Sequence, residues 1–287
     1  MIVRGNETVL VQGITGKQGT FWSERMREYG TRIVGGVNPK RAGEAHLGLP
    51  VWGTAREAAR ETAIDVAVMF IPPFGVKEAA LDAIEAGIGK IVCLTEHVPV
   101  HDAMYVLAAA RERNCQVIGP NTAGIVTAGE CFVGFMPAFN PLVFQPGKVG
   151  VISRSGSLGT LVCLNLVQAG LGISAFIGIG GDPVIGTTTR DALMVLDADE
   201  RTGAVALVGE IGGSMEEEAA DYARTMKKPI AAFIAGGAAP AGKRMGHAGA
   251  IVMGDTGTYA GKKAALEAAG VTVCPTPSGI AEALRGV

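Results

Sequence analysis

One histidine in the chain stands in a setting that could support chemistry. His247 lies in the segment Gly242-Lys-Arg-Met-Gly-His-Ala-Gly-Ala, where glycines flank the imidazole and Lys243 and Arg244 come shortly before it. A loop of this kind leaves the ring accessible, so it could act as a general base, a metal ligand or a nucleophile toward phosphorus. A purely structural histidine is the fourth reading, and no HxH or HxxxH spacing supports a metal. The residues by themselves leave these roles open.

Two further segments in the same half could hold an anion or orient that histidine. Ser153-Arg-Ser-Gly-Ser157 stands between strand and helix patterns, where hydroxyls and free N–H groups can bind a phosphoryl group. Gly209-Glu-Ile-Gly-Gly-Ser214 has the same placement and adds the Glu210 carboxylate. A carboxylate bonded to one ring nitrogen fixes the tautomer and leaves the other nitrogen able to attack. We interpret Ser214, Glu216 and Glu217 only as a helix N-cap followed by acidic first-turn residues.

A glycine-rich turn near the start of the chain is a second candidate site. Gly13-Ile-Thr-Gly-Lys-Gln-Gly19 follows an apolar strand pattern and opens a helical one, where backbone N–H groups and the helix dipole bind phosphate. Its spacing is GxxGxxG, and a tight turn without a ligand is the alternative. The next strand ends with Lys40 and Arg41, where an NAD-binding domain usually has a carboxylate. An additional phosphate on the ribose, as in CoA or NADP, fits these cations, and a solvated basic turn is the alternative.

Alternating strand and helix patterns must position these residues. Short runs rich in valine and isoleucine alternate with amphipathic segments of about 10 to 15 residues, which is typical of βαβ units on a parallel sheet. We predict an α/β protein with domains over residues 1–125 and 148–287 and a linker over 126–147. In the first half, strands are expected at 8–12, 32–37, 65–71, 90–94 and 116–118, and helices at 19–29, 55–61, 75–86 and 101–113. In the second half, strands are expected at 149–153, 174–179, 204–208, 229–234 and 271–274, and helices at 158–169, 188–196, 215–225, 257–269 and 278–284.

Composition excludes several classes of function. With 287 residues, 48% of them apolar, the chain can form a sizeable core and is not a disordered protein. A net charge of −2 gives no basis for bulk capture of nucleic acid or of an anionic membrane. The charged fraction of 18% fits either a surface covered by a partner or small enclosed domains. Five cysteines without a CxxC pair and no long apolar run predict a cytoplasmic protein without a membrane span, with core thiols at Cys93, Cys115 and Cys163.

Motifs spread over nearly the whole chain resemble one known family, the α subunits of succinyl-CoA synthetases within the nucleoside-diphosphate-forming acid–CoA ligases. Nine motifs carry the resemblance in order: Gly16-Lys-Gln-Gly-Thr20, Gly35-Gly-Val-Asn-Pro-Lys40, Thr95-Glu96, Gly119-Pro-Asn121, Pro146-Gly-Lys-Val-Gly150, Ser153-Arg-Ser-Gly156, Gly178-Ile-Gly-Gly-Asp-Pro183, Gly209-Glu-Ile-Gly-Gly213 and Gly242 to Ala250.

The resemblance implies a fold, a reaction and a partner. The fold is an N-terminal Rossmann-like CoA-binding domain followed by a flavodoxin-like ligase domain, both with parallel sheets. An ATP-grasp β subunit, in an αβ or α2β2 assembly, would bind ATP or GTP with Mg²⁺, and no metal is implied on this chain. The nucleotide phosphorylates a histidine, the phosphohistidine passes its phosphoryl group to a small carboxylic acid, and CoA displaces phosphate from the acyl phosphate.

Residue by residue, the resemblance also implies individual roles. His247 matches the phosphorylated histidine, Glu210 matches the carboxylate that orients it, and Ser155, Gly156 and Ser157 match the helix N-terminus that holds the phosphohistidine. The matched CoA contacts are Gly16, Lys17, Gln18, Gly19 and Thr20 at the phosphates, with Val37, Lys40, Ile71, Pro72 and Glu96 around the nucleotide. The histidines that match no catalytic motif are His46, His97 and His101.

The sequence departs from the family pattern at three places, one of which is the hydrophobic segment Phe135-Met-Pro-Ala-Phe-Asn-Pro-Leu142. Thr122 and Ala123 stand where the family usually has Cys-Pro, and Thr160 and Leu161 replace a tyrosine and a carboxylate. Succinate is the expected acid, and a ligase of the same mechanism for malate, citrate or a sulfonated acid is the alternative. A non-catalytic sensor of CoA or a dinucleotide is a further alternative, which would have no use for both His247 and Glu210.

Overall fold

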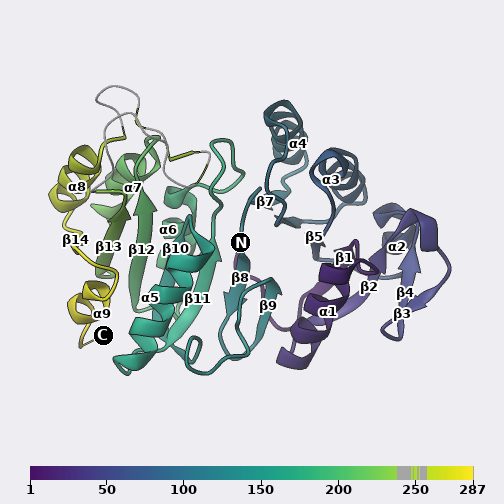
Figure 1. Cartoon of the computed structure of the whole chain (residues 1–287), viewed down its shortest axis with the longest axis horizontal. Helices are drawn as coiled ribbons and strands as arrows, with labels where there is room; N and C mark the ends of the chain where they lie inside the picture. Colours follow the sequence, from purple (N-terminus) through teal and green to yellow (C-terminus); the bar gives the residue numbers. More distant parts are fainter. Residues whose placement is uncertain (238–246, 248, 251, 253–256, 287) are drawn as a thin grey trace. The chain divides into compact units, whose positions relative to one another are not determined.

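A computed structural model describes residues 1–237, 247, 249–250, 252 and 257–286 of the chain. The chain forms two compact units (Figure 1). The first contains Val3–Met136 together with Val184–Gly186, and the second contains Pro137–Pro183 and the chain from Thr187 onward. Each unit is an α/β structure, as the sequence predicted, and the helices and strands of each are given in turn below.

The first unit is built on a sheet of order β3-β4-β2-β1-β5-β6-β7. The strands are β1 (Thr8–Gln12), β2 (Arg32–Val37), β3 (Ala45–His46), β4 (Leu49–Trp52), β5 (Val66–Met69), β6 (Lys90–Cys93) and β7 (Gln116–Ile118). All neighbouring strands are parallel except the β3–β4 pair. The helices are α1 (Lys17–Tyr29), α2 (Ala55–Glu61), α3 (Val76–Glu85) and α4 (Val100–Glu112), with 3₁₀ turns η1 (Pro39–Arg41) and η2 (Pro73–Gly75).

Local sequence signals explain where these elements begin and end. All five residues of β1 are buried, which fits a central strand with helices on both faces. Thr54 caps α2 by accepting a hydrogen bond from the backbone N–H of Glu57. Gly30 ends α1 at φ +126°, a conformation that favours glycine. The central strands therefore place their carboxyl ends, and the loops that follow them, at one edge of the sheet.

The second unit contains the sheet order β14-β13-β12-β10-β11. Its strands are β10 (Pro146–Ser153), β11 (Ile173–Gly178), β12 (Ala204–Glu210), β13 (Ile230–Ala235) and β14 (Thr272–Val273). Its helices are α5 (Gly156–Gln168), α6 (Thr189–Ala198), α7 (Met215–Ala223), α8 (Tyr259–Ala268) and α9 (Gly279–Ala283). Helices α5 and α9 pack together, and α6, α7 and α8 form a second packed row (Figure 1).

Parallel register aligns the ends of the strands in this unit. Ser153 at the end of β10 pairs with Val208 of β12 and with Gly178 at the end of β11. Glu210, the last residue of β12, pairs with Ala235 at the end of β13. The loops that follow β10, β11, β12 and β13 therefore leave the sheet at the same edge, which is where an open parallel sheet usually binds its ligand.

The sequence missed two pieces of antiparallel structure. One is the β3–β4 hairpin, and the other is formed by β8 (Gly124–Thr127) and β9 (Cys131–Gly134), partly inside the segment expected to be an irregular linker. The turn between β8 and β9 contains Gly129 at φ +80°, as short hairpin loops require. Thr31 of the first unit ties down this hairpin, because its hydroxyl donates to the Phe132 carbonyl at 2.6 Å. The apolar run from Gly124 carried the strand signal, and the prolines beyond it obscured that signal.

The five cysteines are all buried and free, as predicted for Cys93, Cys115 and Cys163. Burial raises the pKa of Cys115 to about 11 and, with smaller contributions from nearby carboxylates, that of Cys131 to about 12. The pKa of Cys163 is also raised by burial. Within the described residues, no helix combines the length and apolar character that crossing a membrane requires.

Candidate functional site

The glycine loop of the first unit presents backbone rather than side chains. Gly13 takes φ +84° and donates its N–H to the Val37 carbonyl at 2.9 Å, which ties the loop to the neighbouring strand. Gly16 occupies the N-cap of α1, and no side chain caps this helix end. A Cβ on Gly19 would come within 2.1 Å of the Gly13 carbonyl oxygen, so only glycine fits there. The amino end of α1 is thus left uncapped and open to an anion.

Two cavities of the first unit adjoin this loop. One encloses about 800 Å³ and the other about 730 Å³, and they share Gly16, Phe70, Ile71 and Pro72. Of the predicted CoA contacts, Val37 lines the larger cavity, whereas Lys17, Gln18 and Gly19 line the smaller one. Volumes of this size are typical of sites for small ligands and cofactors.

Three of the predicted CoA contacts, Thr20, Lys40 and Glu96, line neither of these cavities. Thr20 uses both donors within the protein: its N–H bonds the Gly16 carbonyl at 2.8 Å and its hydroxyl bonds the Ile14 carbonyl at 3.0 Å. Lys40 and Glu96 are exposed and line neither cavity. Thr20 therefore supports the loop through its own bonds, and Lys40 and Glu96 lie outside the two cavities.

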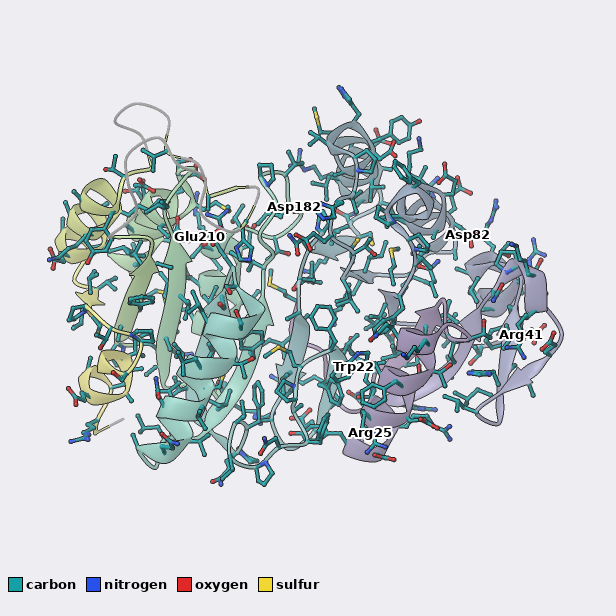
Figure 2. All side chains as sticks on the ribbon, viewed as in Figure 1. Trp22, Arg25, Arg41, Asp82, Asp182 and Glu210 are labelled. Carbon is teal, nitrogen blue, oxygen red and sulfur yellow. The ribbon has the colours of Figure 1, made fainter. Side chains whose placement is uncertain are left out.

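Sequence reasoning also missed residues that line these cavities. Arg56 of α2 faces the larger cavity, where it pairs with Asp82 at 2.7 Å and with Glu85 at 2.9 Å. Arg41, named in the sequence only as one of two cations, lines the same cavity, whereas its neighbour Lys40 does not. Figure 2 shows Arg41, Asp82 and Trp22 in this unit. Arg56 lies on α2, a helix that the sequence predicted, but no local pattern distinguished this arginine from other exposed cations.

In the second unit, His247 and Glu210 are in direct contact. The ring Nδ1 lies 2.7 Å from Oε2 of Glu210, whose carboxylate is 8% exposed at the end of β12 (Figure 2). A carboxylate only accepts hydrogen bonds, so the proton lies on Nδ1 and a neutral ring carries its lone pair on Nε2. The His247 side chain is 28% exposed. Lys243 and Arg244 lie outside the described residues.

Two glycines allow the side chains of His247 and Arg154 to lie against the backbone. A Cβ on Gly181 would sit 2.6 Å from Cγ of the His247 ring, and one on Gly249 would sit 2.6 Å from a guanidinium nitrogen of Arg154. The Gly249 N–H also donates to the Gly181 carbonyl at 3.2 Å. Backbone from the loop after β11 therefore forms one wall beside the imidazole.

The amino end of α5 lies at the same edge of the sheet. Ser155 is the N-cap of this helix, and its hydroxyl accepts the Leu158 N–H at 3.4 Å and lies 3.2 Å from the Ser157 hydroxyl. Arg154, the residue before Ser155, contacts Glu210 through Nη2 at 3.1 Å. The helix that begins at Ser155, Gly156 and Ser157 thus directly follows Arg154. Arg154 contacts Glu210, and Glu210 contacts His247.

A chain of buried charges continues behind Glu210. Arg154 and Glu216 have side chains that are 2% and 0% exposed, and Lys262 of α8 is also fully buried. Glu216 accepts the backbone N–H of Glu210 at 3.2 Å and pairs with Lys262. Glu216 is an acidic first-turn residue of α7, as predicted, but it is fully buried, and its partner Lys262 lies 46 residues further along the chain. Ser214 makes no side-chain cap, and its hydroxyl bonds Glu218 instead.

The remaining histidines lie in the first unit. His46 Nε2 is 2.8 Å from the Thr20 hydroxyl, which already donates elsewhere, so the ring donates to Thr20 and helps to hold the glycine loop. His97 is exposed. Among the described residues, no group of three or more histidine, cysteine or carboxylate side chains could hold a metal ion.

Comparison with protein families and curated sequences gives concordant results. A CoA binding domain family matches residues 5–97, and a CoA-ligase family matches residues 152–272. The chain is 45% identical over 287 residues to the succinate–CoA ligase [ADP-forming] subunit alpha 1 of Archaeoglobus fulgidus, covering all of this chain and 98% of the relative. It is 46% identical to the corresponding subunit of Methanothermobacter thermautotrophicus, covering 99% of this chain and 96% of the relative. It is also 42% identical to the ADP-forming sulfoacetate-CoA ligase subunit SauD of Bilophila wadsworthia, covering all of this chain and 99% of the relative.

Solved structures resemble the whole chain as well. The ATP citrate lyase of Methanosaeta concilii, bound to (3S)-citryl-CoA, superimposes with a TM-score of 0.91 at 26% identity over 99% of this chain. The chain spans only half of that longer polypeptide. A dinucleotide-forming acetyl-coenzyme A synthetase of Ca. Korarchaeum cryptofilum shares the fold, with a TM-score of 0.78 at 22% identity over 96% of this chain and 60% of the other.

Proposed function

The chain belongs to the CoA-ligase family that includes the alpha subunits of ADP-forming succinate–CoA ligases, and on that premise we propose that it is the catalytic alpha subunit of an acid–CoA ligase acting on succinate. The observation that carries the proposal is the 2.7 Å bond between His247 Nδ1 and Glu210 Oε2. This bond directs the lone pair of a neutral ring to Nε2, as a nucleophile requires. The proposed domains are a CoA-binding domain over 1–125, a connection over 126–147 and a ligase domain over 148–287.

The proposed reaction has three displacement steps. His247 Nε2 attacks the terminal phosphorus of a nucleoside triphosphate, so that an N–P bond forms and the nucleoside diphosphate leaves. A carboxylate oxygen of the acid then attacks the phosphohistidine, which forms an acyl phosphate and returns the lone pair to Nε2. Finally the CoA sulfur attacks the acyl carbon, the thiol loses its proton, and phosphate leaves. Glu210 stabilises positive charge on the ring when His247 carries the phosphoryl group.

The helix end at Ser155, Gly156 and Ser157 is the proposed cradle for the phosphohistidine. Its N–H groups and the positive end of the helix dipole favour an anionic phosphoryl group. Buried Arg154 adds a positive charge next to Ser155 while it pairs with Glu210. We expect both features to favour the phosphorylated state of His247.

CoA is proposed to bind at the glycine loop of the first unit. Gly16 and Lys17 begin α1 without a side-chain cap, which suits the pyrophosphate. Arg41 and Arg56 face the larger cavity and suit the ribose phosphate. Gln18, Gly19, Val37, Ile71 and Pro72 are proposed to complete the contacts, with Lys40 and Glu96 at the periphery and Thr20 supporting the loop.

The nucleotide is proposed to come from a separate β subunit with an ATP-grasp domain. These relatives are alpha subunits of ADP-forming ligases, which favours ATP and implies a partner chain. Mg²⁺ would accompany the nucleotide on that partner, where it would neutralise the triphosphate. An αβ or α2β2 assembly is proposed on the same basis, and the free buried cysteines fit a cytoplasmic protein.

A sulfonated acid is the second candidate substrate. The sulfoacetate-CoA ligase subunit of Bilophila wadsworthia is 42% identical over essentially the whole chain, close to the identity of the succinate relatives. The departures at Thr160 and Leu161 fall on α5 directly after the proposed cradle, and Leu161 is 41% exposed. Thr122 and Ala123 are buried and keep the loop before β8 in place, since the Thr122 hydroxyl accepts the Gly124 N–H.

Discharge of the phosphoenzyme tests the proposal. The chain is phosphorylated by ATP together with its cognate β subunit, freed of nucleotide, and mixed with CoA and succinate, sulfoacetate, malate or citrate. Fastest loss of the phosphoryl group with succinate supports the proposal. A tenfold preference for another acid, about 1.4 kcal/mol of transition-state binding, would replace the substrate and keep the mechanism. A wild-type chain that never becomes phosphorylated would instead favour a non-catalytic sensor.

A further inference from the structure

Lys262 is a fully buried ammonium close to the proposed phosphorylation site. It is the fourth residue of α8, and the described chain leading to that helix resumes at Gly257. Its Nζ pairs with Oε2 of Glu216 and lies 3.1 Å from Oε2 of Glu217. A buried lysine is costly to desolvate unless its charge is paired, so these contacts are needed for it to stay charged.

Glu216 connects this lysine to the strand that carries Glu210. One of its oxygens faces Lys262, while the other accepts the backbone N–H of Glu210 at 3.2 Å and lies 4.0 Å from Arg154 Nη1. A Cβ on Gly209 would come 2.8 Å from that oxygen, so the carboxylate lies directly against the end of β12. Helices α7 and α8, which carry the pair, lie side by side (Figure 1).

Glu210 is consequently held from three sides. His247 contacts Oε2, Arg154 contacts Oε1 at 3.1 Å, and Glu216 fixes the backbone. Charges alternate along the series Lys262, Glu216, Arg154 and Glu210, and each member is at least nine-tenths buried. Without Lys262, the cation that the described structure leaves next to Glu216 is Arg154, at 4.0 Å, which Glu210 also needs.

We propose that Lys262 is a positioning residue for phosphoryl transfer: by holding Glu216, it keeps Arg154 on Glu210 and Glu210 on His247. The proposal rests on the proposed function, since it concerns the same histidine. The ion-pair partners of Lys262 are Glu216 and Glu217 rather than the imidazole. The effect of Lys262 is transmitted through the carboxylate that sets the tautomer of the imidazole.

Lys262→Met tests this role, with Lys263→Met as the matched control on the same helix. Lys263 is 44% exposed and pairs across one turn with Glu267 at 3.7 Å. In the complex with the β subunit, we expect Lys262→Met to slow single-turnover phosphorylation about 10- to 100-fold, as removal of an outer partner commonly does. Lys263→Met should stay within about twofold. The Kd for CoA should be unchanged in both, because the CoA site lies in the other unit.

A double variant guards against simple misfolding. Lys262→Met with Glu216→Met removes both charges, so it leaves no unpaired ion in the core and is expected to fold. In the double variant Glu216 no longer competes for Arg154, but the Glu210 N–H has lost its acceptor. If positioning is correct, its phosphorylation rate therefore lies between those of Lys262→Met and the wild type, while its unfolding temperature stays close to that of the wild type. A folded double variant with the wild-type rate would overturn the proposal.

The histidine tautomer provides a readout that stability alone does not move. ¹⁵N-labelled histidine in the full chain gives signals from four residues, of which His46, His97 and His101 are internal references. Wild-type His247 should be protonated on Nδ1, and Lys262→Met should mix the two neutral tautomers. A tautomer unchanged in Lys262→Met would contradict the proposal. If the wild type is never phosphorylated, the proposed function fails, while this measurement still decides the role of Lys262.

Discussion

The turns that open α1 and α5 are alike in position and opposite in construction. Each follows a strand of a parallel sheet and starts a helix of 13 residues. The turn before α1 has no side-chain cap and faces open cavities, whereas Ser155 caps α5 and buried Arg154 precedes it. An uncapped helix end suits a ligand that binds reversibly. A capped end beside paired charges suits a group that stays bonded to the chain's own histidine.

Replacement of His247 should have the largest effect, and it should affect the second unit alone. His247→Ala removes the proposed nucleophile, so phosphorylation by ATP should fall by about 10³-fold or more. CoA binding at the α1 turn should be unaffected, since it belongs to the other unit. Acid-labile ³²P incorporation and calorimetric titration with CoA measure the two properties. Full turnover by the variant would remove His247 from the mechanism.

Glu210→Gln should give the next largest effect. The amide keeps the shape of the side chain but can present its NH₂ group to Nδ1, which favours the wrong tautomer, and it cannot balance a charged ring. We expect phosphorylation to slow about 100-fold. Rapid-quench measurement of the first turnover checks this value. A rate equal to that of the wild type would show that Arg154 and the backbone alone orient the site.

A methyl group added to the first turn of α1 should weaken the binding of CoA and leave phosphorylation of His247 unchanged. In Gly19→Ala the new Cβ would meet the Gly13 carbonyl oxygen at 2.1 Å, so the loop must shift. The Kd for CoA should rise about tenfold or more, which corresponds to at least about 1.4 kcal/mol. Gly89→Ala is the control, because its nearest neighbour is 4.0 Å away and it lies outside both cavities. Equal CoA affinity in the two variants would exclude the loop as the binding site.

Ser155→Ala tests the capped helix end of the second unit. Loss of the cap on α5 should lower the free energy of unfolding by about 1 kcal/mol, or less given the long 3.4 Å bond. For a chain of this size we expect the Tm to fall by a few degrees, about 2 to 4 °C for 1 kcal/mol. Calorimetry measures this, and Ser157→Ala, which removes no bond to a backbone N–H, should shift Tm less. A larger fall in Tm for Ser157→Ala than for Ser155→Ala would contradict the role of Ser155 as the cap of α5.

Alkaline pH gives the smallest expected effect. The pKa values of Cys115 and Cys131, about 11 and 12, are raised by burial, so the unfolded chain loses these protons first. Their contribution to stability is complete below about pH 8.5 and declines as the pH rises above it. At pH 8, iodoacetamide should modify both thiols in urea but not in the folded chain, as mass spectrometry would reveal. Rapid alkylation of the folded chain would contradict the burial of these thiols.

The sequence predicted most strands and helices correctly because each has a local pattern. Strands β1, β2 and β7 and helix α2 match the predicted bounds, and α1 begins two residues earlier than predicted, at Lys17. His247 and Glu210 were named from their glycine settings, and the structure brings them into contact. Neither local pattern nor spacing could reveal the burial of Glu216, since its counterion lies on a distant helix. Arg154 stood inside a named motif but was not distinguished from a surface cation.

The burial of the Arg154–Glu210 pair has a consequence for ionic strength. Both side chains are less than one-tenth exposed, so dissolved ions cannot screen their attraction effectively. The arginines at the larger cavity differ, because Arg56 is 53% exposed and Arg41 is 41% exposed. Added salt should therefore weaken capture of an anionic ligand by the first unit well before it disturbs the alignment of His247. At high ionic strength, weak binding of the anionic ligand would therefore limit activity before any change in the alignment of His247 does.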